Sequence, residues 1–189
     1  MMLNGVRQQE KKFRPIACAE RIETVSVSLR DSMHVVSDPK NLDVSVYEVF
    51  GTMLGVDCER REGEDSGIEV RPAHSVTAVV GFGGILSGAC ILSCNESAAR
   101  MMAEKMTGSA FGAVDNVVKD GIGELCNMVA GGWKSKVPVL AANCGLSLPA
   151  VITGRDYNLH VQAPEFRLRH LYRFERVMFE VLIVCDGLL

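Results

Sequence analysis

The strongest constraint on the fold is a long segment, from about residue 114 to at least residue 133, whose apolar residues recur with the period of an α-helix. On a helix of 3.6 residues per turn these residues share one side, which must pack against a core. They are Val118, Ile122, Leu125, Val129 and Trp133. The opposite side carries a row roughly 60° wide, called here the polar row, made of Asp120, Glu124, Asn127 and Gly131.

The polar row has two interpretations, which are solvation of an exposed helix and a docking surface for another molecule. The spacing of the acid and the amide alone favours solvation. Glycines also crowd the segment, and each costs a helix interior about 0.5–1 kcal/mol relative to alanine. Residues without side chains would let another molecule approach Glu124 and Asn127, so we expect the glycines to favour docking. They are Gly121, Gly123, Gly131 and Gly132.

Composition indicates one globular domain of ordinary size. The 189 residues are 48% hydrophobic and 23% charged, with a net charge of −3, which differs from the basic character of nucleic-acid-binding proteins. No apolar run approaches the roughly 20 residues of a membrane span, and the N-terminus lacks the pattern of a signal peptide. We therefore expect a cytoplasmic protein with neither a nucleic-acid nor a membrane partner.

Seven cysteines at irregular spacing fit buried thiols in a reducing compartment. Cys90 and Cys94 could be tested as metal ligands, but no second cysteine or histidine pair of matching spacing follows. Cys126 leans toward the core side of the long helix, and that segment contains no histidine to act as a base. We expect no metal site, no cysteine nucleophile and no cofactor bound by this chain.

The chain divides into an N-terminal extension, residues 1–40, and a domain, residues 41–189. An amphipathic helix at residues 42–54 is followed by β-rich sequence, as is the long helix. This order indicates a duplicated α/β unit. In the shorter helix Glu48 is followed by Gly51, so the acid and amide pair occurs only in the long helix.

Capping residues and breakers mark the ends of the helices. The expected signals are Gly55 after residues 42–54, Asn95 or Ser93 before a helix at residues 95–107, Gly108 after it, and Pro138, which should kink or end the long helix.

The β-rich regions predict a hairpin and several further strands. The glycine-rich residues 81–84 suit a hairpin turn that needs positive φ. Pro149 is tolerable only at a sheet edge or a bulge. The expected strands cover residues 75–80, 85–94, 146–154, 158–162, 166–172 and 177–185.

Several motifs together resemble a known family. Asp120, Glu124 and Asn127, followed by Pro149 within Ser-Leu-Pro-Ala-Val-Ile-Thr-Gly, resemble the signature of the CheC/CheX/FliY group of chemotaxis phosphatases, and CheX most closely. Supporting pieces are Val-Phe-Gly-Thr-Met-Leu-Gly-Val in the helix at residues 42–54 and Gly-Glu-Leu-Cys-Asn-Met-Val-Ala-Gly-Gly in the long helix. The resemblance implies a layered α/β fold of pseudo-duplicated helix plus antiparallel-rich sheet units.

The resemblance also implies an activity, which is removal of phosphate from the phospho-aspartate of a CheY-like response regulator. By this resemblance Glu124 contacts the regulator's lysine, and Asn127 orients the attacking water. Asp120 supports them, and Pro149 shapes the neighbouring strand. The resemblance further implies a homodimer, and Mg²⁺ is expected in the partner regulator.

Elementary chemistry agrees with these roles. Phosphoryl transfer from an activated acyl phosphate needs mainly positioning and charge stabilisation. An amide can both donate and accept hydrogen bonds to water, and it needs no shifted pKa. Two other hypotheses stay open, which are a non-catalytic CheX-like adaptor in two-component or flagellar signalling and a self-contained enzyme with a cysteine or metal site.

Overall fold

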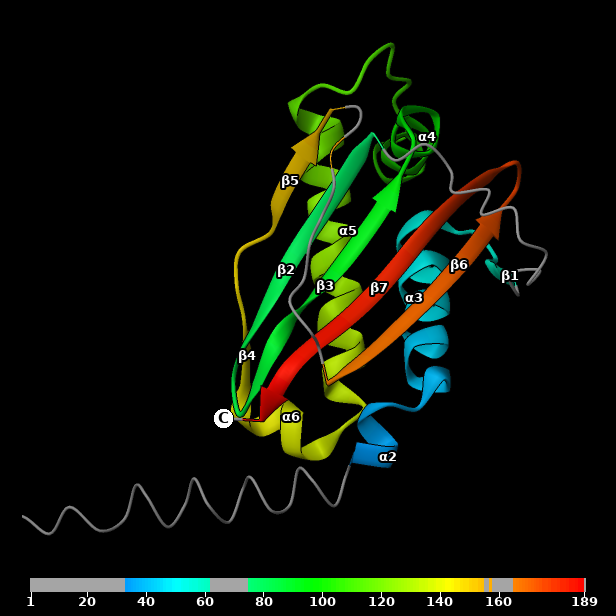
Figure 1. Cartoon of the computed structure of the whole chain (residues 1–189). Coiled ribbons are helices and arrows are strands. Elements are labelled where there is room, and N and C mark those ends of the chain that lie inside the picture. Colours follow the sequence, from blue (N-terminus) through cyan, green and yellow to red (C-terminus); the bar gives the residue numbers. More distant parts are fainter. Residues whose placement is uncertain (1–32, 62–74, 155–156, 158–164, 189) are drawn as a thin grey trace, which may run out of the picture.

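The computed structural model describes residues 33–61, 75–154, 157 and 165–188. Within these ranges seven strands form one antiparallel sheet in the order β1-β6-β7-β3-β2-β4, and β5 also pairs with β2 (Figure 1). β4 and β5 therefore share one edge of the sheet. The strands are β1 (Glu59–Arg61), β2 (Val76–Gly84), β3 (Leu86–Cys94), β4 (Cys144–Leu146), β5 (Ala150–Thr153), β6 (Phe166–Phe174) and β7 (Val177–Leu188).

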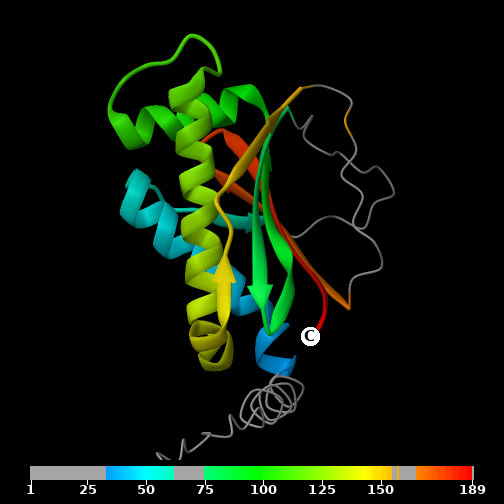
Figure 2. The same cartoon turned by 90° about the vertical axis from the view of Figure 1, so that its left-hand side faces the viewer.

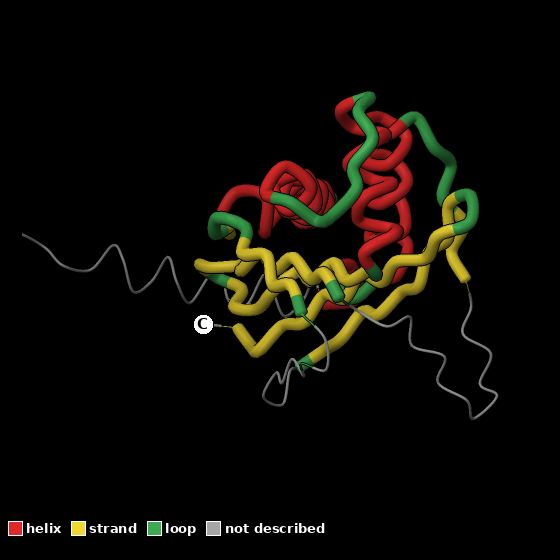
Figure 3. Tube along the Cα trace, turned by 90° about the horizontal axis from the view of Figure 1, so that it is seen from above, coloured by secondary structure: helices red, strands yellow, loops and turns green. Residues whose placement is uncertain are grey.

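Helices cover one face of this sheet, so the domain has two layers (Figure 3). The longest helix, α5, packs against α3 and α4 and runs beside the edge formed by β4 and β5 (Figure 2). This arrangement confirms the predicted layered α/β fold with an antiparallel sheet. The helices are α2 (Met33–Val36), α3 (Pro39–Leu54), α4 (Glu96–Thr107), α5 (Asn116–Ser135) and α6 (Pro138–Asn143).

Helix α5 forms as predicted, with its apolar side in the core. Asp115 caps it by accepting a hydrogen bond from the Val118 N–H at 3.0 Å. The expected effect of Pro138 is only partly right, because α5 already ends at Ser135 and Pro138 begins α6. A proline suits that first-turn position, where no N–H partner is needed. The five residues expected in the core are fully buried: Val118, Ile122, Leu125, Val129 and Trp133.

The two other predicted helices are confirmed together with their caps. Asn95, rather than Ser93, caps α4 by accepting a hydrogen bond from the Ala98 N–H at 2.8 Å. Gly108 follows α4 with a φ of 71°, and Gly55 follows α3 with a φ of 65°. Glycine adopts this left-handed conformation without steric cost.

Helix α3 begins earlier than expected, at Pro39, with Asp38 as its N-cap. It therefore runs across the boundary predicted between residues 40 and 41. Val36 of the preceding α2 is fully buried in the core. Residues 1–32 of the predicted extension lie outside the described residues.

The prediction that residues 81–84 form the hairpin turn is wrong, because these residues extend β2. Gly81 pairs with β3, and Gly83 pairs with β4 on the other side. Of these four residues only Gly84 has a positive φ, 118°. A Cβ there would lie next to the backbone oxygen of Asn143. Gly84 thus permits a close approach of the chain at residue 143, and the turn is confined to the end of the glycine-rich segment.

The strand expected over residues 146–154 forms as β4 and β5, separated by residues 147–149. This break confirms that Pro149 lies at a sheet edge, where its missing N–H removes no ladder hydrogen bond. β6 and β7 confirm two other expected strands and are longer than predicted. The strand expected at residues 158–162 lies outside the described residues.

A buried polar cluster joins α3 to β6, two elements that are far apart in the sequence. The Nδ1 of His170 and the hydroxyl of Tyr172 each lie 2.8 Å from Oδ1 of Asp43. Arg60 of β1 donates to the other carboxylate oxygen at 3.0 Å. The His170 side chain is only 5% exposed, and its burial lowers the pKa of the imidazole below the usual value of 6.5, although the Asp43 carboxylate opposes this effect.

This lowered pKa makes the protein less stable in mild acid. Below a pH of about 6.5 an unfolded chain protonates His170, whereas the folded protein resists protonation, so the unfolded state binds more protons. We expect the urea-unfolding midpoint to fall as the pH decreases from 7.5 to 5.5, and to fall less in His170→Gln. The other histidines are common to both proteins, so equal pH dependence in the two would contradict this account.

Candidate active site on helix α5

The polar row lies on the outer side of α5, opposite its buried apolar side. Asp120 and Glu124 are exposed, and Asn127 is half-buried. Glu124 and Asn127 are three residues apart, so their side chains are neighbours on the helix surface. Within the described part of the chain, no hydrogen bond or ion pair engages the side chains of these three residues. The acid and the amide are therefore available to another molecule.

Pro149 lies next to this row, although it is 22 positions beyond Asn127 in the sequence. A Cβ placed on Gly123 would lie 3.3 Å from Pro149 Cβ and 3.3 Å from Val151 Cγ2. Gly123 is therefore the point where α5 touches the residues that connect and follow β4. The structure thus places Pro149 against the part of α5 that carries Asp120, Glu124 and Asn127.

The glycines of α5, which we expect from the sequence to serve the approach of another molecule, have packing contacts within the chain. Each faces another element of the same chain. A Cβ on Gly121 would lie 3.5 Å from Met106 Sδ of α4, and one on Gly132 would lie 3.3 Å from Ser45 Cβ of α3. One on Gly131 would lie 3.8 Å from a methyl carbon of Leu146 in β4. The missing side chains at Gly123 and Gly132 let α5 pack closely against the β4–β5 edge and α3, whereas a Cβ at Gly121 or Gly131 would make ordinary van der Waals contact.

The connection between β4 and β5, residues 147–149 and called here the edge loop, is held to the sheet by Ser147. Its backbone N–H donates to Gly81 O at 2.9 Å, and its Oγ accepts from the Gly81 N–H at 2.8 Å. The same Oγ donates to Leu148 O at 2.9 Å. No local sequence pattern indicates a role for Ser147 or Leu148, although they are the two residues before Pro149.

Helix α3 offers no second acid and amide pair. Glu48, at the position compared with the acid of the polar row, forms an ion pair with Lys136 Nζ at 2.7 Å. Gly51 follows it where the long helix has an amide. The ion pair joins α3 to the segment after α5, so Glu48 has a structural partner.

The cysteines considered as ligands or nucleophiles are core residues. Cys90, Cys94 and Cys126 are all fully buried. Burial raises the pKa of Cys94 to about 12, and the Cys126 thiol and burial raise the pKa of Cys90 well above its usual range. Among the described residues, no group of three or more His, Cys, Asp or Glu side chains could hold a metal ion.

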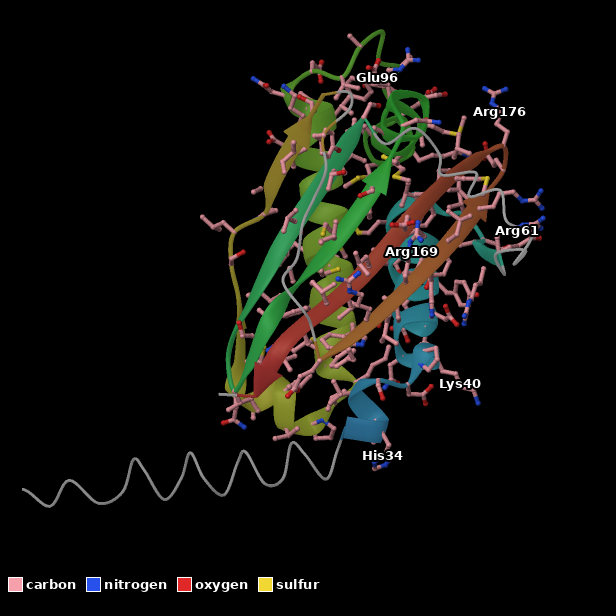
Figure 4. All side chains as sticks on the ribbon, in the orientation of Figure 1. His34, Lys40, Arg61, Glu96, Arg169 and Arg176 are labelled. Carbon is pink, nitrogen blue, oxygen red and sulfur yellow. The ribbon has the colours of Figure 1, made fainter. Side chains whose placement is uncertain are left out.

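Basic side chains labelled in Figure 4 lie away from the edge loop. Lys40, Arg61, Arg169 and Arg176 are on the side of the molecule that carries α3, β1 and β6. Two of them form ion pairs there, Arg169 with Glu180 at 2.6 Å and Arg61 with Glu59 at 4.0 Å. The edge loop lies at the opposite edge of the sheet from β1 and β6. No helix of the described part is long and apolar enough to cross a membrane.

A family model and a similar protein both indicate the same family. The sequence model of the family described as "Chemotaxis phosphatase CheX" matches residues 76–169. A relative from Thermotoga maritima named CheY-P phosphatase CheX is 32% identical over 117 residues, which is 61% of this chain and 74% of the relative.

Solved structures share the fold. The chemotaxis protein CheX from Vibrio vulnificus aligns with a TM-score of 0.67 at 18% identity, over 80% of this chain and 99% of that one. CheX in a complex with CheY, BeF3 and Mg²⁺ from Borrelia burgdorferi aligns with a TM-score of 0.64 at 19% identity, over 78% and 97% of the two chains. Together with the sequence match, which includes the whole of α5 and the edge loop, these likenesses show that the chain belongs to the CheX family of chemotaxis phosphatases.

Proposed function

We propose that this chain dephosphorylates the phospho-aspartate of a CheY-like response regulator, with the polar row of α5 as its active edge. The observation that carries the proposal is an acid and an amide, neighbours on a rigid helix, that have no partner among the described residues. Membership in a phosphatase family supports the reaction, and the Thermotoga relative is named a CheY-P phosphatase. In this reaction water attacks phosphorus, the bond to the aspartyl oxygen breaks, and the aspartate leaves as a carboxylate.

Asn127 is the group that would orient the attacking water. Its amide oxygen can accept a hydrogen bond from the water, and its NH₂ group can donate to a phosphoryl oxygen. The bond that breaks is the P–O bond of an acyl phosphate. Because this bond is already activated, positioning supplies most of the required acceleration. Asn127 is half-buried and its amide has no hydrogen-bond partner among the described residues, which supports this role.

Glu124 would contact the lysine of the regulator, and Asp120 would support the pair from one turn earlier. Removing one partner of an ion pair that is buried in a complex costs affinity, because the other charge is left buried and unpaired. Pro149 has a packing role in this proposal, because it lies against Gly123, which is located between Asp120 and Glu124 in the sequence of α5. Asn127 therefore acts on the reaction rate, while Glu124 acts on binding.

The proposal assigns Mg²⁺ to the regulator and no cofactor to this chain. The Borrelia complex, which contains CheY and Mg²⁺ as well as CheX, supports this assignment. A homodimer and a cytoplasmic location also belong to the proposal. The family resemblance supports the dimer, and the cytoplasmic setting of response regulators supports the location.

Asn127→Ala tests the proposed function. A CheY-like regulator from the same genome is phosphorylated with labelled acetyl phosphate, and phosphate release is followed with and without the protein. We expect wild type to accelerate release and Asn127→Ala to lower kcat by about a hundredfold, as for other lost transition-state hydrogen bonds. The control Asn143→Ala removes an exposed amide on α6 and should match wild type. Binding without any acceleration by wild type would instead favour an adaptor.

Glu124→Gln tests the docking role. Loss of a charge-assisted hydrogen bond should raise KM for the phosphorylated regulator about tenfold and change kcat little. Glu104→Gln, on the exposed side of α4, is the matched control and should leave KM unchanged. A normal KM in Glu124→Gln would exclude the proposed contact with the regulator's lysine.

A further inference from the structure

Leu148 is the most exposed of the large hydrophobic residues in the described part of the chain. It is 90% exposed, compared with 51% for Val117 and 42% for Val44. Single exposed apolar residues are common and need no explanation by themselves. The setting of Leu148 is different, because the residues on both sides of it are fixed in place.

Ser147 and Pro149 hold the backbone of Leu148 in place. Ser147 makes two hydrogen bonds with the backbone of Gly81, one through its N–H and one through its Oγ. Its Oγ also donates to the carbonyl of Leu148 at 2.9 Å. On the other side, Pro149 has a fixed φ and packs 3.3 Å from the position of a Cβ on Gly123. An apolar side chain presented on an ordered loop loses little conformational freedom when a partner covers it.

Leu148 also lies within reach of any protein that docks on the polar row. Gly123 is one helical turn from Asn127, and Leu148 is adjacent in the chain to the proline that touches Gly123. A standard interface covers about 800 Å² on each partner, which corresponds to a patch reaching about 16 Å from its centre. One turn of helix spans only about 5.4 Å. The edge loop therefore lies within the reach of a receiver domain centred on Asn127.

We propose that Leu148 is an apolar anchor for the phosphorylated response regulator, and that it contacts a hydrophobic patch beside the regulator's phosphorylation site. This inference rests on the proposed function, because the regulator is the occupant that α5 would bring to the edge loop. Leu148 adds affinity and partner selectivity. It takes no part in orienting the water.

The test is Leu148→Ser in the assay described above, with the same CheY-like regulator labelled with acetyl phosphate. Loss of the buried leucine side chain should raise KM about tenfold and leave kcat within about twofold of wild type. The matched control is Val44→Ser, which shortens an exposed aliphatic side chain on α3, and it should change neither constant. Leu148 is almost fully exposed, so circular dichroism and the melting temperature should match wild type.

The outcomes separate this inference from the proposed function. An active wild type, an inactive Asn127→Ala and an unchanged KM in Leu148→Ser would overturn the anchor and leave the phosphatase function intact. No acceleration by wild type would overturn the proposed function itself. Sedimentation velocity of Leu148→Ser checks the rival occupant, a second copy of this chain. A shift from a larger to a smaller species, with KM unchanged, would assign Leu148 to self-association and overturn the anchor.

Discussion

The close packing of α5 against its neighbours is the constraint on which the site depends. Gly123 brings the helix against Pro149, and Gly132 brings it against Ser45 of α3, each with 3.3 Å between the position of a Cβ and the facing atom. With a larger residue at Gly123, the helix and the edge loop would have to separate, and with a larger residue at Gly132, the helix and α3 would have to separate. The glycines thus lower the helix propensity of α5, and they also fix the distance between the polar row and the sheet edge.

A rigid helix suits the chemistry that the site is proposed to perform. A phosphatase for an acyl phosphate needs little acid–base work of its own, so its main requirement is that an amide and an acid keep their relative positions. The fully buried apolar side of α5 fixes the backbone positions from which Glu124 and Asn127 project before any partner binds. The motions that the reaction requires are then made by the regulator and the water.

The helix, its buried side and its polar row were predictable because period and capping are local properties of sequence. Tertiary contacts were not predictable in the same way. The glycines were assigned to a partner molecule because sequence cannot show that Met106, Ser45 and Leu146 face them. Residues 81–84 were assigned to a turn because glycine signals both positive φ and close strand pairing. The two hydrogen bonds between Ser147 and Gly81 join residues 66 positions apart, and no local sequence pattern reveals them.

The central claim is that a neutral amide at position 127 orients the water, and Asn127→Asp tests it most directly. The substitution keeps the shape of the side chain, removes its NH₂ donor and adds a negative charge beside the phosphoryl group. Single-turnover decay of the labelled regulator should be measured at saturating phosphatase between pH 6 and 8. The account predicts decay about a hundredfold slower than with wild type throughout this range. Decay as fast as with wild type would show that a carboxylate serves equally well and would contradict the account.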